Sequence, residues 1–263
     1  MHRYASRARP LLLAAALAAT AGLAVSESAQ AAAPPGTGPV IISSSGAAVT
    51  VWSVLTPQGT FAVDASSSPD QVTWTTPVPL DQGVEPKVAL TADGHAIAVW
   101  QALNGATSLG IHASVRTPAG TWSSPVGLAP TGQNPLIAID SAGDAIAVWA
   151  STSAGIQTSA LPAGGHWSAP VTLSTDTNAT PALAVAPNGT ALIAWGPSDG
   201  YVQASAGSIT GSWSTPATIS LDLYHMRGLK VTLDSDGQGS ASWSYNDGIL
   251  QTVTLSDGVW STP

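Results

Sequence analysis

The sequence predicts an all-β fold built from five similar repeats, and three observations lead to this prediction. Gly stands six residues before Trp in GAAVTVW, GHAIAVW, GDAIAVW, GTALIAW and GQGSASW, which end at Trp52, Trp100, Trp149, Trp195 and Trp243. These residues, the inner tryptophans, follow one another at steps of 48, 49, 46 and 48 residues. A second Trp follows in each repeat, and these outer tryptophans are Trp74, Trp122, Trp167, Trp213 and Trp260. A period in the forties with strand character predicts a five-bladed β-propeller with four antiparallel strands per blade.

The second repeat shows how each blade is expected to form. Residues 86–90, PKVAL, predict a strand, and Ala92-Asp93-Gly94 supplies the turn chemistry of a hairpin. Residues 96–100 then predict a returning strand that is apolar on both faces, as expected if neighbouring blades cover it. Ile111–Ser114 predicts the third strand and Trp122–Leu128 the fourth. His112 in the third strand aligns with Gln157, Gln203 and Gln251, which predicts a hydrogen bond repeated from blade to blade.

The N-terminus predicts export. Residues 1–31 combine a basic start, an apolar run of about 15 residues from Leu11 to Val25, and the small-x-small site Ala29-Gln30-Ala31. The run is short for a membrane-spanning helix, so we expect a cleaved signal peptide and a secreted, extracellular protein without membrane insertion after cleavage. A short linker, residues 32–39, is expected before the propeller, residues 40–263. The expected repeats are residues 40–85, 86–134, 135–180, 181–228 and 229–263.

The charge of the mature chain limits its partners. Removal of residues 1–31 leaves four basic and fourteen acidic side chains, a formal net charge of −10 without any basic cluster. Nucleic-acid binding depends on clustered Lys and Arg, so no nucleic-acid partner is expected. The chain has no cysteine, so the fold is expected to be stabilised by a stacked core rather than by disulfides.

The tryptophans have two possible roles. One Trp at a fixed offset in each repeat predicts a repeated packing contact, because each buried indole removes about 150 to 250 Å² from water. Alternatively, the indoles could be platforms on which sugar rings stack. We expect packing for both the inner and the outer tryptophans.

The sequence contains no evident catalytic machinery, and we expect no metal and no cofactor. The Asp-Gly and Asn-Gly turns lack the acidic ligand that closes a calcium loop, so they are interpreted as hairpin turns. Glu85 is the one glutamate after the expected cleavage site, at the offset held by Thr37, Asn134, Thr180 and Gly228. Glycosidases usually need two carboxyl groups, and no partner for Glu85 is evident.

The clearest departure from the repeat predicts a ligand site. The link between Trp213 and Leu229 is long and carries Leu223-Tyr224-His225-Met226-Arg227. The loops of the fourth and fifth repeats could bring further aromatic and polar groups beside it. The candidate ligand-binding residues are therefore Tyr201, Tyr224, His225, Arg227, Tyr245 and Asp247. The alternative is that this link only packs against an irregular last blade.

The repeats, which end in W-S-x-P, make the chain similar to secreted bacterial β-propellers of the lectin and sialidase-like kinds. The resemblance covers about residues 40–263, and it implies a fold rather than an activity. We expect a non-catalytic binding module, with an extracellular glycan or protein as its partner. The alternatives are a glycoside-processing enzyme and a protein-interaction scaffold. The sequence leaves the oligomeric state open, and it also leaves open whether the ring closes, stays open or is completed by another copy.

Overall fold

The computed structural model describes residues 36, 38–197, 200–221, 226–245 and 248–262. The repeats lie within one compact body, Ala31–Pro263. The described residues form strands and turns without an α-helix, so the predicted all-β class is confirmed. None of them forms a helix long and apolar enough to cross a membrane.

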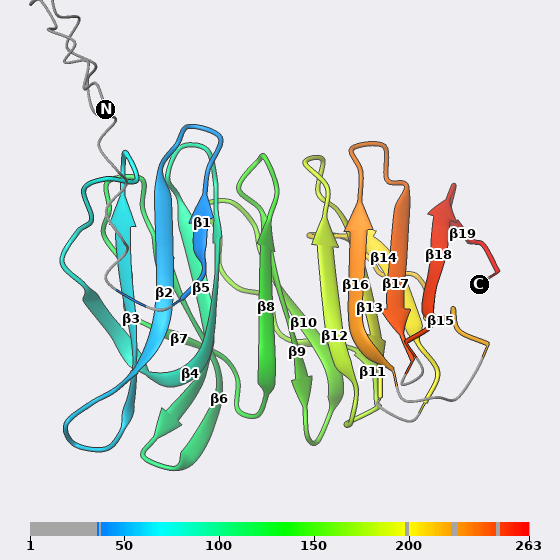
Figure 1. Ribbon diagram of the computed structural model, residues 1–263, viewed down its shortest axis with the longest axis horizontal. Helices are drawn as coiled ribbons and strands as arrows, with labels where there is room; N and C mark the ends of the chain where they lie inside the picture. The colour runs from blue at the N-terminus through cyan, green and yellow to red at the C-terminus, as the bar shows by residue number, and fades with distance from the viewer. Residues whose placement is uncertain (1–35, 37, 198–199, 222–225, 246–247, 263) are drawn as a thin grey trace, which may run out of the picture. The chain divides into compact units, whose positions relative to one another are not determined.

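Nineteen strands form five antiparallel four-stranded repeats in chain order (Figure 1). Repeat 1 contains β1 (Val40–Ile42), β2 (Ala48–Leu55), β3 (Phe61–Ser68) and the start of β4 (Val78–Leu90). Repeat 2 contains the rest of β4 with β5 (Ala96–Asn104), β6 (Thr107–Arg116) and β7 (Val126–Ala129). Repeat 3 contains β8 (Gln133–Ile139), β9 (Ala145–Ser151), β10 (Gly155–Leu161) and β11 (Val171–Ser174).

The last two repeats have the same strand order. Repeat 4 contains β12 (Thr180–Val185), β13 (Thr190–Gly196), β14 (Gln203–Ser208) and β15 (Ala217–Thr218). Repeat 5 contains β16 (Arg227–Leu233), β17 (Gly239–Ser244), β18 (Leu250–Ser256) and β19 (Val259–Trp260).

The strand β4 belongs to two repeats at once. Its first half pairs with β3 from Ala65↔Val78 to Ala62↔Gln82, and its second half pairs with β5 from Gly83↔Ala102 to Leu90↔Ala96. The two four-stranded repeats therefore join into one seven-stranded sheet. The outer strand of one repeat and the inner strand of the next are a single continuous segment here, whereas a loop separates them in the other repeats.

The inner tryptophans of repeats 2 to 5 each pack against the preceding repeat. Trp100 packs with Val49, Val51 and Val63, and the same relation holds for Trp149, Trp195 and Trp243. All four are at most 1% exposed, which confirms that they pack in the core. The outer tryptophans are partly buried, and those of repeats 2 to 5 lie against the same clusters. Each of repeats 2 to 5 thus contributes two indoles to the boundary with the repeat before it.

The first and last repeats differ from the interior ones. Trp52 belongs to the first repeat, and a Cβ built on Gly36 would lie 2.0 Å from its Cδ2 atom, so the Gly36 backbone lies directly on the indole. In repeat 5, Ser240 and Ser242 occupy the positions of Ile97 and Val99. They pair with Thr254 and Thr252, which are exposed. The far face of repeat 5 is therefore a polar sheet surface, which we call the end face.

The hydrogen bond predicted to recur at the position of His112 is present in repeats 3 and 4, where the inner tryptophan donates it. It is absent at Gln251, because the buried indole nitrogen of Trp243 has no partner among the described residues. The Trp149 and Trp195 indole N–H groups donate to the Oε1 atoms of Gln157 and Gln203, at 3.3 and 3.2 Å. In repeat 2 the Trp100 indole donates instead to Asp81 Oδ2 at 3.3 Å. The same oxygen lies 2.8 Å from His112 Nδ1. His112 therefore takes part in the repeated interaction as predicted, but through a carboxylate from the strand shared with repeat 1.

Candidate functional site

Five identical hairpin turns lie at one end of the repeats and frame the site. Each turn begins with a backbone N–H that donates to the carbonyl four residues later, as in Thr91 N to His95 O at 2.9 Å. Its fourth residue is a glycine with positive φ, between 80 and 89° in Gly46, Gly94, Gly143, Gly189 and Gly237. These positions need a residue that tolerates the left-handed region. The interpretation of the Asp-Gly and Asn-Gly sequences as hairpin turns is confirmed.

Side chains connect most neighbouring turns. Ser45 Oγ donates to the Ala92 carbonyl at 2.6 Å, across the boundary between repeats 1 and 2. Ser141 Oγ donates to the Pro187 carbonyl at 2.6 Å, between repeats 3 and 4. Asn188 Nδ2 donates to the Ser235 carbonyl at 3.2 Å, between repeats 4 and 5. In each case a hydroxyl or amide of one turn is bonded to the second residue of the next turn, and we call this contact a latch.

The boundary between repeats 2 and 3 has no latch among the described residues. Asp93 stands at the turn position of Ser45 and Asn188, and an ionised carboxylate has no proton to donate to the Ser141 carbonyl. Its Oδ1 atom instead accepts the Thr91 hydroxyl and, at 3.2 Å, the His95 N–H. These two hydrogen bonds lower the pKa of the Asp93 carboxyl, with a smaller contribution from the His95 charge. The carboxylate therefore stays ionised at neutral pH, and the two turns are not joined.

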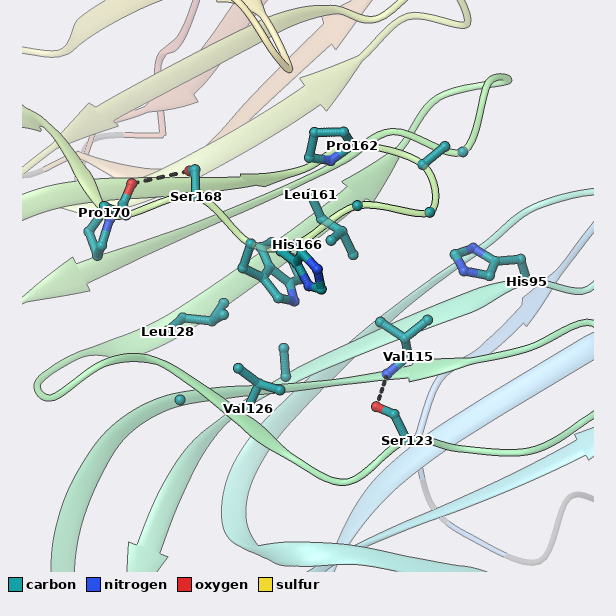
Figure 2. Close-up of a pocket in the computed structure, with 18 residues that line it drawn as sticks. His95, Val115, Ser123, Val126, Leu128, Leu161, Pro162, His166, Ser168 and Pro170 are labelled. Atoms are coloured by element: carbon teal, nitrogen blue, oxygen red, sulfur yellow. Dashed lines mark hydrogen bonds between the residues drawn. The ribbon is translucent and has the colours of Figure 1, made fainter.

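A groove opens at this boundary. One cavity of about 560 Å³ lies between the two turns and is lined by Asp93, His95 and Ser141, among others. A second cavity of about 610 Å³ continues along the outer strands of the two repeats (Figure 2). Both cavities are lined by His95, Gly143, Ala163 and Gly164, so we treat them as one and call it the 2/3 groove.

The walls of the 2/3 groove combine apolar surface with a few polar groups. Figure 2 shows His166 near the middle of the larger cavity, among Val126, Leu128 and Leu161, with His95 at one side. The partly buried outer tryptophan Trp167 also lines it. A partly exposed indole beside aliphatic side chains and imidazoles can contact a small polar ligand through both its apolar and its hydrogen-bonding faces.

The polar groups of the groove differ in their availability. The Ser123 hydroxyl accepts the Val115 N–H and donates to the Ser124 carbonyl, both at 3.1 Å. Ser168 is engaged in the same way by Ala160 and Ala169. The imidazoles of His95 and His166 form no hydrogen bond with other described residues. The two imidazoles are therefore free to bind a ligand, beside the Trp167 indole.

Glu85 has a structural contact that the sequence did not reveal. It lies in a bulge of β4 with φ of 56°, and Asn134 occupies the equivalent bulge of β8 with φ of 51°. Glu85 Oε2 accepts the Asn134 N–H at 3.1 Å. The carboxylate therefore connects repeat 2 to repeat 3, which is a contact within the scaffold rather than an arrangement of paired catalytic acids.

The residues predicted from the link between repeats 4 and 5 are described in part. Tyr224, His225 and Asp247 lie outside the described residues. Tyr201 is 44% exposed, Arg227 is exposed at the start of β16, and Tyr245 packs against the core cluster of repeats 4 and 5. Arg227 pairs with Ser244, next to Tyr245. Binding of a ligand at this link stays a prediction.

The sequence analysis did not identify the 2/3 groove. His95, His166 and Trp167 come from two repeats, and their relation depends on how those repeats pack. One sequence signal was available, because Asp93 replaces a residue with a donor group at a repeated turn position. Its meaning depends on a bond between turns that only the structure reveals.

Comparison with known proteins supports the fold. No protein-family model and no curated protein matches the sequence. A fungal lectin from Aleuria aurantia, described as a six-bladed β-propeller with a novel fucose recognition mode, is 14% identical with a TM-score of 0.55. The match covers 85% of this chain and 75% of the lectin. A mutant of that lectin in complex with α-methyl-L-fucoside is 15% identical, with the same coverage and a TM-score of 0.55.

A second fungal protein has a similar fold. A mutant of AofleA from Arthrobotrys oligospora, with three arginines changed to alanine, is 12% identical with a TM-score of 0.53. The match covers 85% of this chain and 70% of AofleA. At these identities the similarity establishes the fold alone. This chain has a fold similar to that of lectin β-propellers.

Proposed function

We propose that this chain is a secreted, non-catalytic carbohydrate-binding β-propeller of five blades, and that the 2/3 groove is its binding site. The observation that carries the proposal is the groove itself, where the latch is missing and where His95, His166 and Trp167 line one cavity. The similar fold of lectins that bind fucosides supports a sugar as the ligand.

The groove suits a neutral sugar. A sugar ring has an apolar face that can lie on the Trp167 indole, and hydroxyls that can bond to the two imidazoles. The acid that lines the groove, Asp93, already accepts hydrogen bonds from Thr91 and His95 of its own turn. Its carboxylate therefore does not require a cationic ligand as a partner. Glu85 is bonded to Asn134, which favours binding over glycoside hydrolysis.

Binding can be tested with variants of the outer tryptophans. A glycan array followed by calorimetry, with methyl α-L-fucoside among the first probes, identifies a neutral ligand. The variant Trp167→Ala should weaken binding of that ligand at least tenfold, about 1.4 kcal/mol. The matched control is Trp213→Ala, because Trp213 is the equivalent residue of repeat 4 and does not line the groove.

The result depends on the comparison of the two variants. Loss of binding in Trp167→Ala with retention in Trp213→Ala supports the proposal, provided both keep a cooperative unfolding transition. Equal affinity of Trp167→Ala and the parent protein excludes the 2/3 groove. In that case Tyr201→Ala and Arg227→Ala test the link between repeats 4 and 5.

Secretion is part of the proposal and has its own test. The N-terminal segment has the composition of a signal peptide, and cleavage after Ala31 would keep Gly36, whose backbone covers Trp52. N-terminal sequencing of protein recovered from the culture medium should begin at Ala32. Recovery of the chain only inside the cell, with Met1 intact, would contradict this part.

A further inference from the structure

Another cavity, outside the 2/3 groove, is lined by the guanidinium of Arg116. It lies between repeats 1 and 2, has a volume of about 250 Å³, and is lined by Val49, Ser67, Leu90, Gly94, Arg116 and Pro118, among others. Arg116 is one of only four basic side chains after residue 31. It lies at the end of β6 and is partly buried.

Arg116 is not neutralised by an acid. Its Nη1 donates to the Gly94 carbonyl at 2.8 Å, and its Nη2 donates to Ser67 Oγ at 3.0 Å. Its Nε is buried and has no partner among the described residues. Among the residues that the structure describes, the one ion-pair contact is between His112 and Asp81. No described carboxylate therefore lies within 4.0 Å of the Arg116 guanidinium.

The acids near the cavity are already engaged. Asp93 lines it, but its carboxylate accepts the Thr91 hydroxyl and the His95 N–H of its own turn. Asp70, two residues beyond the lining residue Ser68, accepts the N–H groups of Val72 and Thr73 at 2.9 and 2.7 Å. No described carboxylate is therefore in direct contact with the Arg116 guanidinium.

A partly buried cation without a contacting carboxylate loses hydration that no opposite charge replaces. Desolvation lowers the pKa of the Arg116 guanidinium, although an arginine remains charged in a protein. A bound anion would offset the loss of hydration and would accept the remaining hydrogens of Nη1 and Nη2, each of which has one printed acceptor, Gly94 O or Ser67 Oγ. The guanidinium fork matches the planar, bidentate geometry of a carboxylate.

We propose that the Arg116 cavity binds the carboxylate of an acidic monosaccharide, a uronic acid. The cavity is small enough to enclose one ring rather than a chain, and Val49, Leu90 and Pro118 supply apolar walls beside the cation. The inference that the ligand is a sugar rests on the proposed carbohydrate-binding function. The inference that the ligand has a carboxylate rests on Arg116 alone, so the two proposals can fail separately.

Calorimetry at pH 7 with glucuronate and galacturonate tests this site, with glucose, galactose and acetate as the neutral and ring-free controls. At least one uronate should bind the parent protein more tightly than its neutral sugar and than acetate. Arg116→Gln should weaken that binding tenfold or more. Arg116→Lys should weaken it by a smaller factor, because an ammonium keeps the charge but not the fork.

The matched control is Lys230→Gln, which removes an exposed basic side chain of repeat 5 and leaves the cavity intact. Uronate affinity should be unchanged in this variant and in Trp167→Ala. Added uronate should raise the Tm of the parent protein, and it should raise the Tm of Arg116→Lys by a smaller amount. If Arg116→Gln does not fold, this comparison of the parent protein with Arg116→Lys is the test.

Three results would overturn the inference. The parent protein could fail to bind uronates, or it could bind them no more tightly than the neutral sugar or acetate. The variants Arg116→Lys and Arg116→Gln could also bind uronate with the same affinity as the parent protein. Loss of uronate binding in Trp167→Ala with retention in the Arg116 variants would assign the ligand to the 2/3 groove instead. If neutral sugars fail to bind but a uronate binds through Arg116, the groove proposal fails and this one stands.

Discussion

The missing latch between repeats 2 and 3 predicts that Asp93→Asn stabilises the protein. Asn188 shows the arrangement that the new amide should adopt. Its Oδ1 accepts the Thr190 N–H at 3.0 Å, and its Nδ2 donates to the Ser235 carbonyl at 3.2 Å. An Asn at position 93 should likewise accept the His95 N–H and donate to the Ser141 carbonyl, so that one turn is joined to the next.

The expected gain follows from one added hydrogen bond. A typical intramolecular hydrogen bond contributes about 0.5 to 1.5 kcal/mol net, and part of this is lost because an amide oxygen is a weaker acceptor than a carboxylate. We expect a gain of about 0.5 to 1 kcal/mol in the free energy of unfolding. For a domain of this size the Tm should rise by about 1 to 4 °C.

The assay is thermal and chemical unfolding followed by tryptophan fluorescence, with Asp93→Ala as the matched control. Alanine removes the charge without supplying a donor and leaves the His95 N–H without its side-chain acceptor, whereas the Thr91 hydroxyl keeps only the His95 carbonyl as acceptor, so this variant should lower the Tm. The lowered pKa of Asp93 means that its stabilising effect is present above about pH 3.9 and is lost as the pH falls further. The advantage of Asn over the parent should therefore widen in acid. A Tm of Asp93→Asn at or below that of Asp93→Ala would refute the role assigned to the latch.

Two further predictions concern repeats 1 and 5. Asp64 faces Trp52 at the position held by Gln157 and Gln203, and burial raises its pKa, so the carboxylate is penalised in the folded state whenever it is ionised. Asp64→Gln should raise the Tm at pH 7. This gain should disappear below about pH 3.9, where the acid is protonated in both states, and an unchanged Tm at pH 7 would count against the desolvation of Asp64. In repeat 5, the double variant Ser240→Ile and Ser242→Val gives the end face the side chains of repeat 2. It should self-associate with rising concentration in sedimentation velocity, whereas a higher Tm without association would show that this face is already covered.

The sequence predicted the features that recur inside one repeat. The fixed Gly-to-Trp spacing predicted the hairpin and the returning strand, and the burial of the inner tryptophans follows from their position on that strand. The alignment of His112 with glutamines also predicted a shared hydrogen-bonding position, because residues opposite each other in a hairpin are set by register alone.

The sequence could not predict features that arise between repeats. Asp81, which replaces the glutamine oxygen at Trp100, lies in the half of β4 that pairs with β3 of repeat 1. Glu85 reaches Asn134 because both lie in equivalent bulges of neighbouring repeats. The 2/3 groove likewise depends on the distance between two turns that are 49 residues apart at Thr91 and Asp140. Period and composition do not encode such distances.

The one-way packing of the inner tryptophans has a consequence for folding during synthesis. Each of these indoles from Trp100 onward is covered by a repeat that left the ribosome earlier, and Trp52 is covered by Gly36, which also precedes it. The surface of the preceding repeat against which a newly synthesised repeat packs is therefore already formed. Packing of the new repeat does not require residues that are synthesised later. Repeat 5 instead carries serine and threonine on its far face, so this face can remain in contact with water without a further repeat to cover it.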